Sequence, residues 1–393
     1  MRERRQPQPS TTPTRAWSSV LALSLALALV ATACAEEGGG SSTTAEAPSD
    51  GAEETTTTAA ATTTEAPAEL RQIDVALSTT SVFGYGYWVA LGLGFYEEEG
   101  LDVSLQGTGG SADVAQILAA NNAAAGMGVP GAMLPAIQAG ANLYPFFTYA
   151  YGEVFDVVVP EGSDITDIAG LEGKVLGISE LAGGEVPLVR ALLVEAGLDP
   201  DSDVEIIEVG TDAPSITAAF DSNRIDAYSS AKADIAAMNA TGLGTVSIAP
   251  ASLATLPAEG LLATEETKGD ADLLTRIGRA TAKGQLMAYS NLDGTVCVLK
   301  DLIPEEFTDD AAGRASLEAV VAITTAPQEN GEYVFGFLDA AGWNTYVNIF
   351  IQGGVLTEEI DMSQFVMDDL LEGINDFDQQ AIVDLATGLP TDC

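Results

Sequence analysis

Short strand-like and helix-like segments alternate along most of this chain, and this alternation limits the folds open to it. Residues 73–77 (IDVAL) predict a buried strand, and residues 87–98 predict a helix with Trp88, Leu91 and Phe95 on one face. The pattern then repeats as strand, helix, strand, helix and strand, in the order LDVSLQG, GGSADVAQILAANN, AAAGMGV, PGAMLPAIQAG and LYPFFTYAY. Because parallel strands need a crossover between them, the pattern predicts a parallel sheet flanked by helices.

The alternation restarts after the segment VFDVVVPEGS. A body of about 325 residues is also too large for one compact core, which favours two lobes. From about Ala251 the periodicity is mostly helical, and we expect this tail to pack on the first lobe. The sequence therefore predicts an α/β protein in which residues 71–158 and 251–393 form lobe 1 and residues 159–250 form lobe 2.

Residues 1–33 have the features of a secretion signal. Arginines precede an apolar run at residues 20–30 that is too short to span a bilayer. The small residues 31–33 before Cys34 resemble a bacterial lipobox, in which the cysteine is acylated and becomes the new N-terminus. We therefore expect Cys34 to be lipidated, and ordinary signal-peptidase cleavage nearby is the alternative.

Residues 34–70 predict a disordered tether between this cysteine and the body. The segment is a mixture of Thr, Ala, Gly, Ser and Glu, with no large apolar side chain between Ala35 and Ala68. Such a segment cannot bury enough apolar surface to order itself. Together with the signal, it predicts an extracytoplasmic protein held to a bacterial cell membrane by a lipid anchor.

Composition excludes several classes of function. The net charge of −43 excludes nucleic acid as a partner and favours a soluble monomer. The chain has no histidine, which removes Ser-His-Asp and Cys-His catalysis and the usual zinc sites. Besides Cys34, only Cys297 and Cys393 remain, and in an oxidising compartment this pair predicts a disulfide.

One glycine-rich segment has the spacing of a dinucleotide-binding loop. Residues 126–131 (GMGVPG) satisfy G-x-G-x-x-G, but Pro130 removes a backbone N–H from the turn that should hold a pyrophosphate. A loop and helix start facing a cleft is the better interpretation. The chain also lacks a P-loop and an EF-hand pattern, so we expect no cofactor and no metal.

Aromatic residues gather after two predicted strands of lobe 1. Tyr85 and Tyr87 follow the first strand at its carboxyl end, where open α/β sheets place their ligands. Tyr149 and Tyr151 fall on one side of a later strand. Trp88 has the position of either a core residue or a ligand contact. These five rings are candidates for a ligand cage, whereas Phe146, Phe147 and Phe155 are expected in the core.

Small and polar residues follow the predicted strands of lobe 2. After one strand, the segment SELAGGEV brings its polar and glycine residues to a helix start, where free N–H groups can hold a polar ligand atom. Two later strand ends repeat the arrangement. The candidates are Ser179, Glu180, Gly183, Gly184, Asp212, Ser230 and Lys232. Each of the polar ones also has the alternative role of a helix N-cap.

Taken in order, several segments resemble one family. They are YWVALGLGFYEEEGLDVSL, GGSADVAQILAANN, ITDIAGLEGKVLGIS, VRALLVEAGLDPDSDVEIIEVG, AAFDSNRIDAYSS and WNTYVNIFIQGGVLTEEIDMSQFVMDDLLEGIN. They are similar to blocks of the extracytoplasmic solute-binding proteins of the nitrate, sulfonate, taurine and thiamine-pyrimidine import type. The resemblance covers residues 72–376, and the segment NNAAAGMGV departs from the family's usual Gly-x-x-Asp start of the third strand.

This resemblance implies a type II periplasmic-binding fold, with two α/β lobes that close on a small molecule and dock on an ABC permease and its ATPase. By position, the family's cleft also includes Ser111, Pro130 and Gly131. One relative in the family is an enzyme that makes the thiamine pyrimidine from its own histidine and uses a cysteine-rich motif. This chain lacks both, so we predict that it is not an enzyme, and an extracellular sensory domain stays open as a third class.

The charges near the predicted cleft favour one kind of ligand. An anion should recruit fixed positive charge, yet the cleft loops offer only Lys232. We therefore predict a planar, neutral or weakly cationic nitrogen heterocycle, with a thiamine-pyrimidine precursor as the first choice. A sulfonate, taurine or nitrate held by helix N-termini is the alternative.

Overall fold

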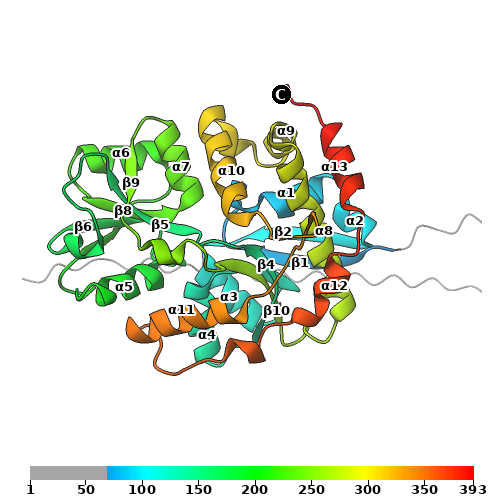
Figure 1. The fold of residues 1–393 in the computed structure, drawn as a ribbon, viewed down its shortest axis with the longest axis horizontal. Coiled ribbons are helices and arrows are strands. Elements are labelled where there is room, and N and C mark those ends of the chain that lie inside the picture. The colour runs from blue at the N-terminus through cyan, green and yellow to red at the C-terminus, as the bar shows by residue number, and fades with distance from the viewer. Residues whose placement is uncertain (1–68) are drawn as a thin grey trace, which may run out of the picture. The chain divides into compact units, whose positions relative to one another are not determined.

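The computed structural model describes residues 69–393 (Figure 1). The predicted signal at residues 1–33, the lipidation at Cys34 and all but the last two residues of the tether lie outside the described residues. Among residues 69–393, no helix is both long enough and apolar enough to cross a bilayer.

The first lobe is built on a five-stranded sheet with the order β2-β1-β3-β10-β4. Strands β1, β2 and β3 are parallel, and β10 runs antiparallel between β3 and β4. The bounds are β1 Arg71–Leu77, β2 Leu101–Gly107, β3 Ala125–Gly128, β4 Leu143–Ala150 and β10 Glu259–Thr264. The sequence predicted a mostly helical chain after residue 251, but all six residues of β10 are buried in this sheet. A short apolar run has no periodicity that separates a strand from a helix.

The second lobe is built on a five-stranded sheet with the order β7-β6-β8-β5-β9. The bounds are β5 Phe155–Pro160, β6 Val175–Ile178, β7 Glu205–Glu208, β8 Ala227–Ala231 and β9 Thr245–Ser247. The chain therefore leaves the first sheet after Ala150 and joins the second at Phe155, earlier than the boundary at residue 158 that the sequence suggested. A small hairpin, β11 Gln328–Glu329 and β12 Glu332–Tyr333, follows in the tail.

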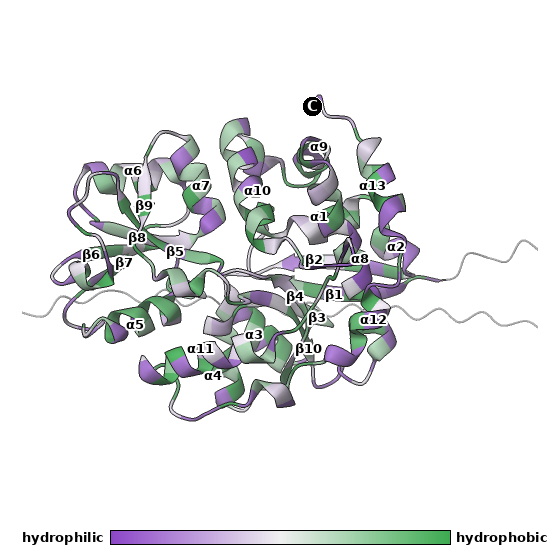
Figure 2. Ribbon diagram, viewed as in Figure 1, coloured by the Kyte–Doolittle hydropathy of each residue, from purple (hydrophilic) through white to green (hydrophobic). Residues whose placement is uncertain are grey.

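Helices cover both sheets. Those whose ribbons carry both hydrophilic and hydrophobic residues in Figure 2, such as α13, bury their apolar face. The α-helices are α1 Tyr85–Gly92, α2 Phe95–Glu98, α3 Ser111–Ala119, α4 Pro130–Gln138, α5 Glu185–Glu195, α6 Ala213–Asp221, α7 Lys232–Ala240, α8 Ala271–Ser290, α9 Leu292–Leu302, α10 Asp310–Thr324, α11 Ala340–Gln352, α12 Leu371–Ile374 and α13 Gln379–Thr387. The single helix predicted at residues 87–98 is split into α1 and α2, because Gly94 has a left-handed backbone with φ of 77°.

The helical tail contacts both lobes, whereas the sequence placed it on the first lobe alone. Helices α8, α12 and α13 pack together on the first lobe, and α9 packs against α1. Helix α10, however, lies against α7, and α11 lies against α5 (Figure 1). The Ser316 hydroxyl of α10 donates a hydrogen bond of 2.8 Å to the Ala233 carbonyl of α7. The tail therefore helps to hold the second lobe beside the first.

A disulfide joins Cys297 of α9 to Cys393, the last residue of the chain, with Cα atoms 5.5 Å apart. This bond ties the segment after α13 back to the helices of the first lobe. The closed loop spans 96 residues of sequence. A loop of this length gives the bond a stabilisation of about 2–5 kcal/mol.

Candidate functional site

A cleft between the two lobes encloses a cavity of about 570 Å³. This volume lies in the range of small-molecule sites, roughly 300–1,000 Å³. Its walls follow the carboxyl ends of β1, β2, β3, β6 and β8, which is where open α/β sheets bind ligands. The lining residues include Ser78, Thr79, Thr80, Ser81, Phe83, Thr108, Ser111, Phe155, Ser179, Glu180, Gly184, Glu185, Thr211, Ser230, Asp234, Glu259 and Glu306.

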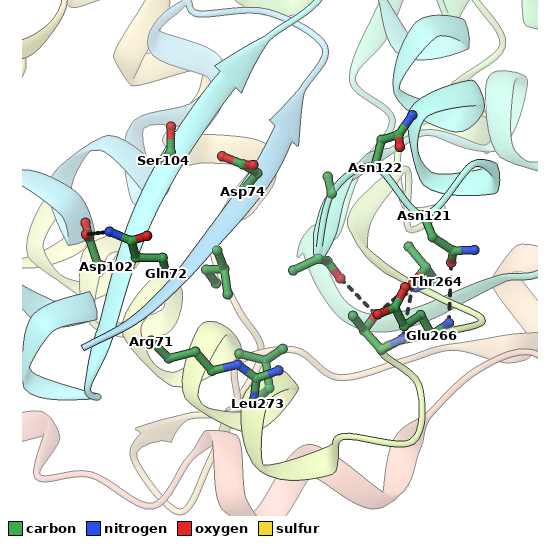
Figure 3. A pocket seen from close by; sticks show the side chains of 14 residues that line it. Arg71, Gln72, Asp74, Asp102, Ser104, Asn121, Asn122, Thr264, Glu266 and Leu273 are labelled. Carbon is green, nitrogen blue, oxygen red and sulfur yellow. Dashed lines mark hydrogen bonds between the residues drawn. The ribbon is translucent and has the colours of Figure 1, made fainter. Parts of the chain in front are cut away.

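A second hollow of about 480 Å³ lies at the opposite end of the first sheet (Figure 3). Arg71, Gln72 and Asp102 stand at the starts of β1 and β2 there, and Gln72 donates a hydrogen bond to Asp102. Because this hollow is at the amino ends of the parallel strands and belongs to one lobe only, closure of the lobes cannot enclose a ligand in it. The cleft is therefore the candidate site.

The loop after β1 supplies a row of hydroxyls to the first-lobe wall. Residues 78–81 read Ser-Thr-Thr-Ser, and all four line the cleft. Ser81 caps the short 3-10 helix Val82–Gly84 by accepting a hydrogen bond from the Phe83 N–H at 3.3 Å. The Glu306 carboxylate accepts from the Val82 N–H at 3.1 Å and so brings the tail to the same wall. These short side chains offer both donors and acceptors to a ligand.

The second-lobe wall combines hydroxyls with carboxylates. Glu185, in the first turn of α5, accepts hydrogen bonds from the backbone N–H and the hydroxyl of Ser179, and the N–H distance is 3.2 Å. Ser230, at the end of β8, donates to Asp234 at 2.6 Å. Glu180 lies beside them at the strand end. The predicted residues Ser111, Ser179, Glu180, Gly184 and Ser230 are thus brought together by the fold.

The cleft carboxylates hold their protons more tightly than ordinary carboxylates. Burial raises the pKa of Asp234 to about 7 and raises the pKa of Glu259 well above its usual value. Burial likewise raises the pKa of Glu180, Glu185 and Glu306, and neighbouring carboxylates add to the shift of Glu180 and Glu306. No lysine or arginine is among the cleft-lining residues that the structure describes.

The structure corrects the position of the predicted aromatic cage. Tyr85, Tyr87 and Tyr149 are 0 % exposed and belong to the core of the first lobe. Tyr87 stacks on Tyr149 with ring centroids 4.6 Å apart. The Tyr149 hydroxyl accepts from the Gly86 N–H at 2.9 Å and donates to the Phe83 carbonyl at 3.2 Å. Their large apolar area favours burial, so these rings form the layer that supports the cleft wall at Phe83.

The other predicted ring positions also lie outside the cleft lining. Trp88 packs partly buried against the core of the first lobe. Tyr151 accepts a hydrogen bond from the Gly336 N–H at 2.8 Å, which ties the end of β4 to the tail. Phe146 and Phe147 are core residues as expected, whereas Phe155 was expected in the core and instead lines the cleft. Phe83 and Phe155 are therefore the aromatic rings of the cleft.

Several other predicted ligand residues have structural contacts instead. Lys232 donates a hydrogen bond of 2.6 Å to the Glu153 carbonyl, between β4 and β5, and does not line the cleft. Asp212 caps α6 by accepting from the Ser215 N–H at 3.0 Å. Pro130 opens α4, and Gly183 precedes the Gly184 that does line the cleft. For Asp212 a local helix cap takes up the polar atoms that a ligand would need, and for Lys232 a hydrogen bond to a segment distant in sequence does so.

Gly131 marks where the two lobes touch. A Cβ atom on Gly131 would lie 2.2 Å from the Gly184 carbonyl oxygen, and one on Gly184 would lie 2.3 Å from a Val129 methyl group. Val129 and Gly131 belong to the first lobe and Gly184 to the second. The described conformation is therefore closed at this rim of the cleft, with backbone against backbone.

Sequence reasoning missed the hydroxyl loop at residues 78–81, the two phenylalanines and four carboxylates, Glu185, Asp234, Glu259 and Glu306. The run of four hydroxyl residues directly after the first strand was a usable signal, because strand ends are where such folds bind ligands. Glu259 and Glu306 gave no signal, since they come from the returning chain far from the other cleft residues.

Fold and cleft together define a type II periplasmic-binding-protein architecture. Over residues 84–293 the chain matches the NMT1/THI5-like family, and it belongs to that family. No curated protein matches it in sequence.

Solved structures share the fold at low sequence identity. The alkanesulfonate-binding protein SsuA of Xanthomonas axonopodis pv. citri, bound to MOPS, is 15% identical, with a TM-score of 0.59 over 76% of this chain and 99% of that one. The aliphatic sulphonate-binding SsuA of Escherichia coli is 14% identical, with a TM-score of 0.59 over 76% and 92%. The nitrate-binding protein NrtA of Synechocystis PCC 6803 is 12% identical, with a TM-score of 0.57 over 82% and 99%.

Proposed function

We propose that this protein captures a small molecule outside the cell membrane and delivers it to an ABC permease with its ATPase. The observation that carries the proposal is the cleft, in which hydroxyl and carboxylate side chains from both lobes face one cavity of about 570 Å³. Contacts from both lobes let a bound ligand stabilise the closed form over an open one. The solute-binding proteins that share the fold support this reading.

For the ligand, we propose a planar nitrogen heterocycle, with a thiamine-pyrimidine precursor as the first choice. Phe83 and Phe155 offer ring faces for stacking, which contributes about 0.5–1.5 kcal/mol per contact. The hydroxyls of residues 78–81 suit the ring nitrogens and amino groups of such a molecule. The second candidate is a sulfonate or nitrate, the ligands named for three proteins of the same fold.

Two measurements on the purified protein test this function. Native mass spectrometry should find a co-purifying small molecule, and a thermal-shift panel of pyrimidines, flavins, sulfonates and nitrate should identify its class, because a ligand of the native state raises the midpoint. Ser179→Ala should weaken the shift, and Ser202→Ala, at an exposed position in the same lobe, is the control. A protein with no bound molecule and no shift with any compound would not be a solute carrier of this kind.

We also propose that a lipid on Cys34 holds the protein at the membrane. The Cys34→Ala protein should move from the membrane fraction into the medium. Retention of this variant in the membrane fraction would refute the anchor. Genes for a permease and an ATPase beside the gene for this chain would favour import over a sensory role.

A further inference from the structure

The charged residues that line the cleft are all acidic. Five carboxylates line it: Glu180 and Glu185 from the second lobe, Asp234 from the start of α7, Glu259 from β10 and Glu306 from the tail. No lysine or arginine is among its described lining residues. A partly closed site with low-dielectric walls concentrates the field of such groups on whatever occupies it.

Glu259 is distinguished from the partnered carboxylates of the cleft. Glu185 and Asp234 accept hydrogen bonds from Ser179 and Ser230, and Glu306 accepts one from the backbone. Glu259 is 0 % exposed, and within residues 69–393 neither of its carboxylate oxygens has a hydrogen-bond partner. A carboxylate buried in this way is costly unless something supplies the missing donors.

The position of Glu259 indicates that the missing hydrogen-bond donors come from the cleft. It begins β10, pairs with Ala150 at the end of β4, and is one of the residues that line the cavity. Beneath it, the phenol oxygen of Tyr87 also has no partner among the described residues, and Tyr149 is already bonded to Gly86 and Phe83. Within residues 69–393, therefore, no N–H or O–H donor is bonded to the Glu259 carboxylate, and the lining of the cavity offers it no lysine or arginine.

We infer that the ligand is an organic cation with N–H donors, and that Glu259 receives its positive charge at the floor of the cleft. This inference rests on the proposed solute-binding function and specifies its substrate class. A protonated amidine or aminopyrimidine fits best, because a planar N–H pair bonds both oxygens of one carboxylate while the ring faces pack on Phe83 and Phe155. Among the residues that the structure describes, no group of acidic side chains is arranged to hold a metal ion.

The same charges disfavour the anions named for the structural neighbours. A sulfonate or nitrate would lie among five carboxylates with no fixed cation in the lining, so only helix N-termini and hydroxyls would oppose the repulsion. The net charge of −43 adds to this field. The chain thus shares a fold with sulfonate- and nitrate-binding proteins, but the charged residues that line its own cleft are acidic.

Titration of the site gives a second prediction. The titratable groups that face Glu259 are Tyr87 from α1, Tyr149 from β4 and the carboxylates across the cavity. Burial raises the pKa of Glu259 well above its usual value, so the empty protein holds a proton that a cation must displace. Binding of a compound with a permanent positive charge should therefore strengthen as the pH rises from about 5 to about 8.

The test uses the whole mature protein and a panel matched by charge. Thiamine, agmatine and spermidine represent cations, uracil and riboflavin neutral molecules, and ethanesulfonate and nitrate anions. At least one cation should raise the thermal midpoint, and no anion should do so. Glu259→Gln should weaken the binding of that cation by about 10-fold or more, whereas Glu172→Gln, at an exposed site in the second lobe, should leave it unchanged.

Each result decides between the two proposals. A midpoint raised by an anion alone would overturn the inference and leave solute binding intact, and so would a binding cation that is indifferent to both Glu259→Gln and pH. No shift with any compound and no co-purifying molecule would overturn solute binding itself. If Glu259→Gln does not fold, Glu180→Gln and the pH series on the unaltered protein test the same charge.

Discussion

Two of the regions of this protein that hold carboxylates differ in how these groups are partnered. At the contact of α2 with α8, Lys283 lies 3.1 Å from Glu98 and 3.0 Å from Glu99, and Arg279 lies 3.0 Å from Glu99. In the cleft, Glu259 has no such partner among the described residues. The first region uses charge to join two segments of the fold. The second leaves a buried carboxylate without a partner among the residues that line a cavity.

The difference teaches how to separate a structural carboxylate from a functional one. Burial is not the criterion, because the Glu99 side chain is only 9 % exposed and still has two cationic partners. The criterion is whether the protein itself completes the hydrogen bonds and the charge. A group left incomplete in a cavity is the better candidate for ligand recognition.

The largest effect on stability should come from removing a cation at the contact of α2 with α8. Lys283→Met removes the cation shared by Glu98 and Glu99 and should lower the free energy of unfolding by about 2–3 kcal/mol, because Glu99 keeps only Arg279 as a cationic partner. Denaturant unfolding measures it. Lys174→Met, which removes a more exposed pair with Asp226 at 3.8 Å, should cost about 1 kcal/mol or less. Equal losses in the two variants would remove the distinction drawn between the regions.

The buried carboxylates of the cleft should make the unliganded protein less stable as the pH rises. The folded pKa of Asp234, about 7, and that of Glu259 lie above their unfolded values, so the stability they confer is present below about pH 4 and is lost as the pH rises through the folded values. We expect a loss on the order of a few kcal/mol between pH 5 and pH 8 without ligand.

Thermal unfolding of the unliganded protein across this range measures the loss. Glu259→Gln should flatten the pH profile, because glutamine has no proton to lose. Glu172→Gln, the exposed control, should leave the slope unchanged. A thermal midpoint that rises with pH in the unaltered protein would show that the cleft carboxylates have hydrogen-bond or ionic partners.

A smaller effect should follow from holding the cleft open. Gly131→Ala places a methyl group 2.2 Å from the Gly184 carbonyl oxygen, so the closed form should lose population and ligand affinity should fall by about 10-fold. Opening also lets water solvate the cleft carboxylates, which should weaken the pH dependence of the stability. Gly269→Ala, where a Cβ meets nothing within 4 Å, is the control for the substitution itself. Unchanged affinity in Gly131→Ala would show that closure does not use this contact.

The sequence alone determined much of the fold. The alternation of strand and helix patterns indicated two α/β lobes, because the two periodicities are local properties of the chain. The resemblance of its segments to a solute-binding family located the cleft at the strand ends. Residues after the predicted strands of lobe 2 marked Ser179, Glu180, Gly184 and Ser230, and the resemblance added Ser111; all five line the cavity.

Only the tertiary structure decided which polar and aromatic residues meet. Tyr87 and Tyr149 are distant in sequence but stack in the core, and a list of residues after a strand cannot show whether a ring turns toward the cleft or beneath it. Glu259 reaches the cleft because β10 returns from the second lobe into the first sheet. Local patterns carry no information on such long-range pairing. The position of Glu259 in the cleft lining therefore follows only from the tertiary structure.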